Sequence, residues 1–451
     1  MSAVGYAKLS AMDSHAFLVR LLTALIPVKG LRKRIRRRLM DRARARWIAS
    51  VVPQVRARYA ELARACAGKL AGGIRLKVCF LVCDAAMFSA EPVYRMMLAD
   101  KRFDPYVAVV PRVSRGDAFL RNTLKVAMDE LSASCENVRC LYDPDTGVAK
   151  SLEGEADIVF TSIAYDEQTL EMYTALPMSQ FALVVQIPYG YGGHLASDLV
   201  RLVFLPQLVL SWKLFVPSKQ TLDMWTETNP LLRGNMVVGG YPKMDRLVRI
   251  PVRTNRPKTV LVCPHHTLAR GMGGLELSNF LKYADFFLRL PGEFPDVHFV
   301  FRPHPLLFPR LATDAWWGER RTADYQAAMS AFPNVEFQQG GDYFDAFVNS
   351  DGMVHDCGSF LGEYFYTGHP QCYMLEDESV LERQFTPFGR KMHDHVDHAF
   401  CEDDVRRFVR GIAAGEDPHA SARATFARDE VCLFHPASAA EVIAEVMRCL
   451  A

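Results

Sequence analysis

The stretch KVCFLVC, residues 77–83, is short, apolar at consecutive positions and preceded by the turn formers Gly72 and Gly73. A strand with one wet face alternates apolar and polar residues, whereas a strand buried on both faces does not. The stretch therefore predicts a parallel strand inside a sheet that helices cover on both sides.

The same rhythm of apolar strand and helix continues along the chain. In the first half we expect strands at 77–83, 106–110, 156–160, 182–187 and 214–216, and helices at 93–100 and 116–132. In the second half we expect strands at 259–263, 297–301, 334–338, 352–355 and 370–374, and helices at 277–290, 323–331, 342–349, 359–366, 403–414 and 437–449. This alternation predicts an α/β fold with mostly parallel sheets.

With 451 residues the chain is too long for one ordinary core. Segment 249–258 is rich in proline and basic residues and marks a domain boundary. We expect a basic helical arm at 1–73 and two Rossmann-like domains at 74–250 and 251–451. Two such domains would face one another across a cleft at the carboxyl ends of their strands.

The compartment follows from cysteine usage and hydropathy. The 11 cysteines include no CxxC pair, which indicates reduced thiols in a cytoplasm. No apolar stretch reaches the ~18 residues that span a bilayer. The apolar run near the N-terminus precedes its basic cluster, so it does not resemble a signal peptide. We therefore expect a cytoplasmic protein.

The net charge of +2 hides a strongly basic segment. Residues 29–46 hold ten Lys and Arg and one Asp, a charge of +9, so the remainder carries 2 − 9 = −7. Together with the apolar run before it, segment 18–46 predicts peripheral binding to an anionic membrane. The rivals are a solvated helix and nucleic-acid binding, and no interleaved aromatic residues support the latter.

Two clusters at predicted strand ends suit a phosphate. Asp356-Cys-Gly358-Ser359 opens a helix, where backbone N–H groups and a hydroxyl can bind an anion, although Ser359 could equally cap its own helix. Arg302-Pro-His304-Pro305 presents a guanidinium and an imidazole on a rigid turn, which could equally be a structural surface turn.

Two further clusters add histidines and glycines. Pro264-His265-His266-Thr267 ends a strand, and adjacent histidines there point in different directions, so a shared metal is not expected. Tyr189-Gly190-Tyr191-Gly192-Gly193-His194 lets the backbone approach a ligand, or is a tight loop without chemistry. The stretch 393–398 holds three His and two Asp, and we interpret it as a polar surface loop rather than a metal site.

These clusters in this order resemble the CDP-glycerol glycerophosphotransferases, the teichoic-acid polymerase family. The resemblance covers about residues 180 to 380 and is strongest over 351–370 and over Gly240-Tyr241-Pro242-Lys-Met-Asp245. Val216-Pro-Ser218 and the Arg302–Pro305 turn are similar to further landmarks of that family. The resemblance implies a GT-B architecture, with an acceptor domain at 74–250 and a nucleotide-donor domain at 251–451.

The resemblance also implies an activity and a site. A polyol phosphate, such as glycerol phosphate, would pass from a CDP-activated donor to a hydroxyl of a polymer or lipid-linked acceptor, in teichoic-acid or capsule synthesis. Other cleft residues would be Ser218, His266, Tyr241 and Asp245. No metal or other cofactor is required, and a homo-oligomer is compatible with the sequence. The residues that would bind the donor phosphates are Arg302, His304, Asp356, Gly358 and Ser359.

One departure from the family concerns the base. Where the family commonly shows a Trp-His-Gly-Thr block with the proposed base, this sequence reads Pro188-Tyr189-Gly190-Tyr191. A phenol of ordinary pKa near 10 is a poor base at neutral pH, so His194 or His265 are the candidates beside Tyr189. The alternatives are a nucleotide-sugar glycosyltransferase and a non-catalytic nucleotide-binding homologue.

Overall fold

The stretch at 77–83 forms β1 (Leu76–Val82), which pairs in parallel with a strand on each side in a seven-stranded sheet. The computed structural model describes residues 29–114, 116–269, 275 and 277–451. The strand order is β3-β2-β1-β4-β5-β6-β7. The other strands are β2 (Phe103–Val109), β3 (Val138–Cys140), β4 (Ile158–Thr161), β5 (Leu183–Gln186), β6 (Lys213–Val216) and β7 (Met236–Val238).

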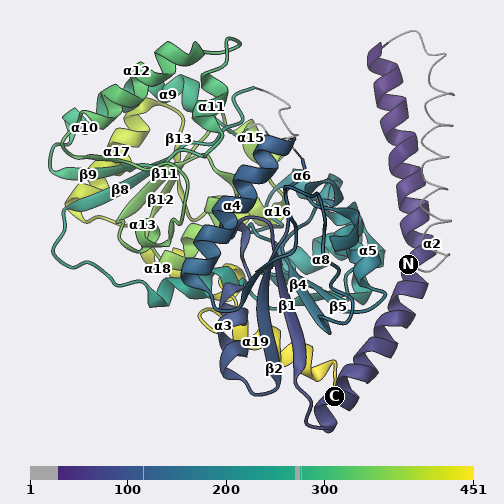
Figure 1. The fold of residues 1–451 in the computed structure, drawn as a ribbon. Coiled ribbons are helices and arrows are strands. Elements are labelled where there is room, and N and C mark those ends of the chain that lie inside the picture. The colour runs from purple at the N-terminus through teal and green to yellow at the C-terminus, as the bar shows by residue number, and fades with distance from the viewer. Residues whose placement is uncertain (1–28, 115, 270–274, 276) are drawn as a thin grey trace.

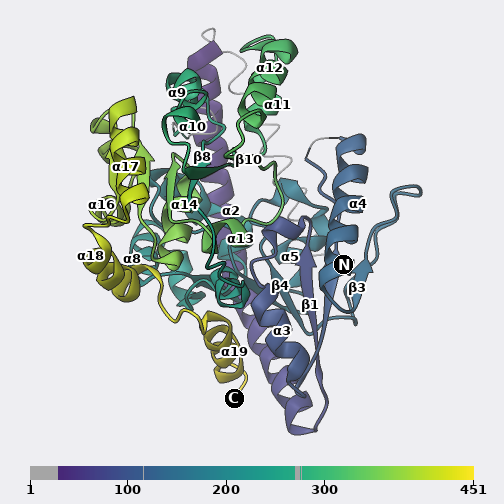
Figure 2. The ribbon, with the colours of Figure 1, turned by 90° about the vertical axis from the view of Figure 1, so that its left-hand side faces the viewer.

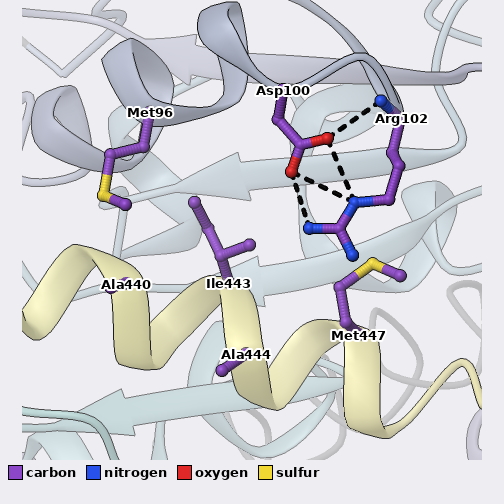
Figure 3. Close-up of a pocket in the computed structure, with 7 residues that line it drawn as sticks. All are labelled: Met96, Asp100, Arg102, Ala440, Ile443, Ala444 and Met447. Atoms are coloured by element: carbon purple, nitrogen blue, oxygen red, sulfur yellow. Dashed lines mark hydrogen bonds and ion pairs between the residues drawn. The ribbon is translucent and has the colours of Figure 1, made fainter.

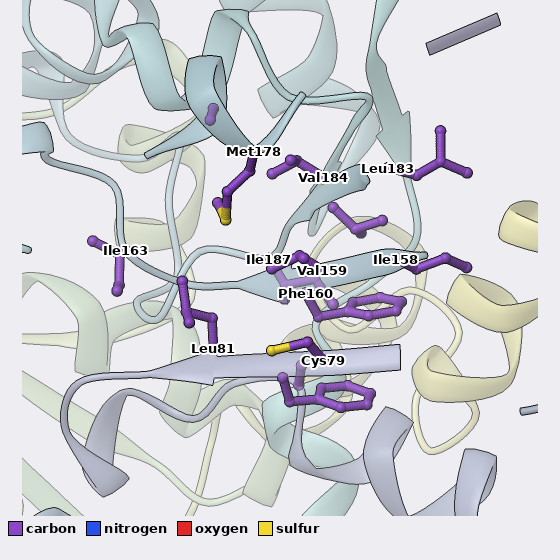
Figure 4. Packing of buried hydrophobic residues seen from close by; sticks show 14 of the residues in the cluster. Cys79, Leu81, Ile158, Val159, Phe160, Ile163, Met178, Leu183, Val184 and Ile187 are labelled. Atoms are coloured by element: carbon purple, nitrogen blue, oxygen red, sulfur yellow. The ribbon is translucent and has the colours of Figure 1, made fainter. Parts of the chain in front are cut away.

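Helices cover both faces of this sheet (Figure 1). They are α3 (Glu91–Ala99), α4 (Asp117–Ser134), α5 (Ala175–Met178), α6 (Ala196–Val200), α7 (Pro206–Val209) and α8 (Lys219–Thr228), with short turns η1 (Ala85–Met87), η2 (Asp166–Gln168), η3 (Glu171–Tyr173), η4 (Leu202–Phe204), η5 (Pro230–Gly234) and η6 (Pro242–Arg249). Consecutive apolar side chains of the strands pack on both faces, among them Leu81, Phe160 and Val184 (Figure 4). Burial on both faces explains why β1 lacks an alternating pattern.

A second parallel sheet has the order β10-β9-β8-β11-β12-β13 and lies beside the first (Figures 1 and 2). Its strands are β8 (Lys258–Cys263), β9 (Val297–Phe301), β10 (Val335–Phe337), β11 (Gly352–His355), β12 (Gln371–Met374) and β13 (Asp397–Ala399). Its helices are α9 (Phe280–Phe287), α10 (Leu290–Glu293), α11 (Leu307–Leu311), α12 (Gly318–Ser330), α13 (Phe344–Val348), α14 (Gly358–Glu363), α15 (Ser379–Gln384), α16 (Pro387–His393), α17 (Glu402–Ala414) and α18 (Ala420–Phe426), with the turns η7 (Tyr364–Thr367) and η8 (Ala427–Val431). The predicted α/β class with two Rossmann-like domains is confirmed.

The edge strands β3 and β13 were not predicted. Each has three residues and at most one of them is fully buried, so neither leaves an apolar run in the sequence. β13 begins inside the stretch 393–398, which we interpreted as a polar surface loop, and that interpretation was wrong. His393 is buried, and its Nδ1 lies 3.0 Å from Nε2 of His398.

The last helix, α19 (Ser438–Arg448), departs from the expected domain range 251–451. Its side chains Val442, Ile443 and Val446 are buried in the core of the first domain, and Figure 2 shows it below the second sheet and next to α3. After the second domain, the chain therefore crosses back to the first domain, whose core covers the apolar face of α19. A cavity of about 350 Å³ between α3 and α19 contains none of the expected site residues (Figure 3).

The described part of the arm forms one helix, α2 (Lys29–Ala71), whose two halves differ. Between Ile48 and Cys66 one side of the helix is buried in the core of the first domain. None of the described side chains between 31 and 46 is buried, and Figure 1 shows this half extending away from the sheet. The apolar run at 18–26 lies outside the described residues. No helix among the described residues has the length and hydropathy to cross a bilayer.

Candidate functional site

Three of the four predicted clusters meet at one edge of the second sheet. β9, β8 and β11 are neighbours and parallel, so their carboxyl ends lie side by side. The Arg302–His304 turn follows β9, the His265–His266 turn follows β8, and Asp356 follows β11. Ligands of open parallel sheets bind at such an edge.

Asp356 holds this edge together through backbone hydrogen bonds. Its two carboxylate oxygens accept the N–H groups of His265 and Asn279, each at 2.5 Å. Burial raises the pKa of Asp356 to about 7, while the two N–H donors act in the opposite direction. A carboxylate repels phosphate, so this geometry makes Asp356 a positioning residue rather than the donor-phosphate contact that the resemblance implies.

The loop that Asp356 anchors brings three imidazole rings together. The ring centroid of His266 lies 4.3 Å from that of His265 and 4.0 Å from that of His304. Among the described residues, these three histidines are the group whose ligand atoms are close enough to hold one metal ion, since the atoms lie within 4.8 Å of one another. The sequence prediction that adjacent histidines point apart does not describe this geometry.

Hydrogen bonds fix the proton positions on two of these rings. The N–H of Leu306 donates to Nδ1 of His304 at 3.1 Å, so the proton of the neutral ring is on Nε2. Oγ1 of Thr267 accepts the N–H groups of Leu277 and Ser278. Its hydroxyl proton is then directed at Nδ1 of His265, 3.0 Å away, and that ring also carries its proton on Nε2.

A protonated Nε2 suits an anion better than a metal. A metal ligand needs an unprotonated ring nitrogen, whereas N–H groups donate to phosphate oxygens. Burial lowers the pKa of His304 to about 3 and that of His265 well below its ordinary value, so both rings are neutral at pH 7. The pair therefore offers two neutral N–H donors that share one edge of the sheet.

The positive charge beside these rings comes from Arg310, which the sequence prediction missed. Its Nη1 donates to the backbone oxygen of His266 at 3.0 Å, and its charge contributes to the lowered pKa of His304. Arg302, the predicted clamp, instead donates to Gln338 and to the backbone oxygens of Gly340 and Gly341 at 2.6 to 2.7 Å. Arg302 thus holds the loop after β10 in this structure.

The fourth cluster reaches this edge from the first domain. A Cβ atom on Gly190 would lie 2.9 Å from Oγ of Ser359, so only glycine fits there without a shift of Ser359. Nε2 of His194 lies 2.7 Å from the backbone oxygen of Gly358, and the hydroxyl of Thr386 donates to the oxygen of Gly193. The loop at 189–194 therefore touches the start of α14, where the sequence placed the phosphate-binding Gly358 and Ser359.

His194 is fully buried, which removes it from contact with a substrate. Burial also lowers the pKa of His194 to about 4. We expect it to join the two domains rather than act as the base.

The buried His194 predicts an acid-dependent loss of stability. The unfolded chain takes up a proton near pH 6.5, whereas the native state resists until about pH 4, so the contribution is intact above pH 6.5 and is lost between pH 6.5 and 4. In H194Q an amide N–H replaces the ring donor and does not titrate. As the pH falls from 6.5 to 4, the unfolding free energy of H194Q should rise relative to that of wild type by about 1.4 kcal/mol per pH unit. Urea denaturation at several pH values measures this, and parallel curves would contradict it.

Tyr189 and Tyr241 belong to a polar network between the domains. The backbone oxygen of Tyr189 accepts hydrogen bonds from the Tyr241 hydroxyl at 2.6 Å and from Nζ of Lys243 at 2.9 Å. Glu363 accepts from Tyr241 and Tyr343 and lies 3.5 Å from Lys243. Tyr189 is 38% exposed, and desolvation raises the pKa of its phenol, so even less of the phenolate that could accept a proton is present at neutral pH.

Two other predicted cleft residues have structural roles. Ser218 is fully buried and caps α8, its hydroxyl accepting the N–H of Thr221. Asp245 is buried at the junction of η6 with α19, where it accepts the N–H of Ala439 at 2.8 Å. The prediction that these two side chains line the cleft is corrected accordingly, because their polar atoms serve helix starts.

The solved structures similar to this chain include two groups of enzymes. The UDP-GlcNAc 2-epimerase from Neisseria meningitidis bound to UDP-GlcNAc aligns with a TM-score of 0.51 and 14% identity, over 82% of this chain and 98% of that one. The wall teichoic acid polymerase TagF soaked with CDPG aligns with a TM-score of 0.53 and 11% identity, over 91% and 97%. The chain has the GT-B fold. No family model and no curated protein sequence matches it.

A carboxyl group on the first-domain side of the GT-B fold was also missed. Asp198 lies at 8% exposure in α6, and one of its oxygens accepts the N–H of Gly193 at 3.0 Å. Burial raises its pKa to about 6, and its charge contributes to the raised pKa of Tyr189. A lone Asp within an apolar stretch gave no signal in the sequence. Its pKa near neutrality is what proton transfer at physiological pH requires.

Proposed function

We propose that this protein transfers a polyol phosphate, such as glycerol phosphate, from a CDP-activated donor to a hydroxyl acceptor in cell-surface polymer synthesis. The observation that carries the proposal is the pair of Nε2–H donors of His265 and His304, with Arg310 beside them, at the carboxyl edge of the second sheet. Such neutral and cationic donors stabilise the charge of a departing nucleotide phosphate.

In the proposed reaction an acceptor oxygen attacks the distal phosphorus of the donor in line. A new oxygen–phosphorus bond forms, the bond from that phosphorus to the bridging oxygen breaks, and CMP leaves with the electron pair. His265, His304 and Arg310 bind the oxygens of the leaving phosphate. The acceptor's proton passes to a base in the first domain.

Asp198 is the base that we propose. His194 is completely buried whereas Asp198 retains 8% exposure, His265 carries its proton on Nε2, and the phenol of Tyr189 holds its proton too tightly. Asp198 is close enough to Tyr189 for their charges to interact, and it has a pKa of about 6. D198N keeps an oxygen for the N–H of Gly193 and removes the base. Turnover should fall by about 10² to 10⁴ with CDP binding retained, and undiminished turnover would assign the base elsewhere.

The leaving group distinguishes this proposal from its alternatives. A phosphotransferase releases CMP, whereas a glycosyltransferase acting at a sugar carbon releases a nucleoside diphosphate. The protein is incubated with CDP-glycerol, UDP-GlcNAc and a GDP-sugar, each with an acceptor, and the products are separated by ion-exchange chromatography. CMP from CDP-glycerol supports the proposal, a nucleoside diphosphate supports a glycosyltransferase, and nucleotide binding without turnover supports a non-catalytic homologue.

We also propose that the N-terminal half of α2, residues 29–46, binds an anionic membrane surface from the cytoplasmic side. Residues 29–46 carry a charge of +9, and no described side chain between 31 and 46 is used in the core. Each basic residue near such a surface contributes about 1 kcal/mol. A chain without residues 1–46 should no longer co-sediment with phosphatidylglycerol vesicles, while its melting temperature stays near that of the full chain. Neutral phosphatidylcholine vesicles are the control, and unchanged sedimentation would contradict the proposal.

A further inference from the structure

A second polar cavity lies in the first domain, where α2 meets the loop that follows β4. Its volume is about 260 Å³, and it is lined by residues of α2, η2, η3, α5 and α7. None of the residues discussed so far for phosphate or proton transfer lines it. The cavity is therefore a separate feature of the first domain.

Four side chains that line this cavity each have a buried polar atom without a hydrogen-bond partner. The atoms are Nε1 of Trp47, Oδ1 of Asp166, Oγ1 of Thr169 and Nε2 of Gln207. A buried polar atom left unpaired costs about 1 to 3 kcal/mol, and native structures contain few of them. Four such atoms around one cavity indicate that a polar ligand supplies their hydrogen-bond partners.

The orientation of Gln207 is fixed by the backbone. Its side-chain oxygen accepts the N–H of Ala175 at 2.7 Å, and the residue is 1% exposed. The amide nitrogen is therefore the end that lacks a partner. A hydrogen-bond donor is held in place at this cavity by a contact that a ligand does not need to break.

The mixture of donors and acceptors selects the chemistry of the ligand. An anion would meet the carboxylates of Asp166 and Glu171, and a cation would meet the N–H groups of Trp47 and Gln207. A hydroxyl both donates and accepts, so it satisfies each kind of atom. Burial raises the pKa of Asp166 to about 6, while the charge of Arg44 acts in the opposite direction. Leu176 and Pro177 add an apolar surface for C–H groups.

We propose that this cavity binds one neutral, hydroxyl-rich unit, a monosaccharide or a short polyol. Its volume suits a single unit rather than a whole nucleotide-linked donor. On the proposed function, on which this step alone rests, the unit belongs to the acceptor and lies next to the arm that would meet the membrane. Binding itself is independent of the transfer reaction.

The test measures binding to the full chain without nucleotide. Saturation-transfer NMR is recorded with glycerol, ribitol, glucose and N-acetylglucosamine, each titrated to about 50 mM, a range that detects millimolar binding. At least one should show saturable binding, while ethyl phosphate and ethylammonium chloride, the anionic and cationic controls with observable C–H protons, should not. Saturable binding of none of the four, or of ethyl phosphate, overturns the proposal. Because no nucleotide is present, failure here and failure of donor binding are separate results.

Matched variants locate the binding. Q207E keeps the oxygen that accepts from Ala175 and loses the amide donor, and W47F keeps an aromatic ring and loses the indole N–H. Each should weaken binding of the probe about tenfold. W47F should leave the melting temperature almost unchanged, whereas Q207E buries a carboxyl in the cavity that Asp166 and Glu171 line and should lower it. D100N, at the cavity between α3 and α19, should bind as wild type does (Figure 3). Unchanged affinity in Q207E and W47F would show that the probe binds elsewhere and would refute the assignment.

Discussion

H304A is expected to lower kcat/KM for the CDP-linked donor by about 10² to 10³, the usual cost of one well-placed donor to a developing charge. His304 presents an Nε2–H group because its Nδ1 accepts the N–H of Leu306. Alanine removes that donor, whereas H304Q places an amide N–H in a similar position and should recover part of the loss. Donor turnover and the thermal shift by CDP measure both effects.

The control for this prediction is His298 on β9. Its Nε2 lies 3.7 Å from Oε2 of Glu336, outside the histidine cluster. H298A should bind CDP as wild type does. Retained turnover in H304A, or equal losses in H304A and H304Q with a disturbed fold, would contradict the role of the N–H group.

D356A is expected to lower the free energy of unfolding by about 2 to 6 kcal/mol and to abolish CDP binding. Alanine leaves the N–H groups of His265 and Asn279 buried without an acceptor, at about 1 to 3 kcal/mol each. The loop that carries His265 and His266 then loses its anchor to β11. Urea denaturation gives the stability, and thermal shift with CDP gives the binding.

Asp351 provides a matched control at the opposite end of the same strand. It accepts the N–H of Thr259 and pairs with Lys258 near solvent, far from the carboxyl edge. D351A should cost less stability, because water can replace its oxygens, and should bind CDP normally. If D356A and D351A had equal effects on CDP binding, Asp356 would have no particular role in positioning the histidines.

Much of the fold could be predicted because both sheets are built from buried parallel strands. Runs such as 77–83 and 259–263 are apolar on both faces, and they became β1 and β8. The short edge strands escaped because half-burial leaves no such run. The packing of α19 on the first domain was also not predicted, because the pattern of an amphipathic helix does not show which domain its apolar face contacts.

The sequence predicted strand-end clusters that meet in the structure, but not the contacts among them. Strand ends marked the clusters at His265, His304 and Asp356, and they meet. The proton positions on the two histidines and the anchoring role of Asp356 depend on hydrogen bonds to Thr267, Leu306 and Asn279, which no motif contains. Arg310 is eight residues beyond Arg302 and has no motif of its own, so the sequence did not mark it as the arginine beside the histidines.

The crossing of α19 gives the two lobes a second covalent connection. The chain passes from the first lobe to the second once near 249–258, and it returns before Ser438. Two tethers leave one easy rotation, about the line that joins them, and they hinder twisting and sliding. The two domains should therefore open and close by rotation about the axis that passes through both connections. Each closure then returns loop 189–194 to the same place on α14.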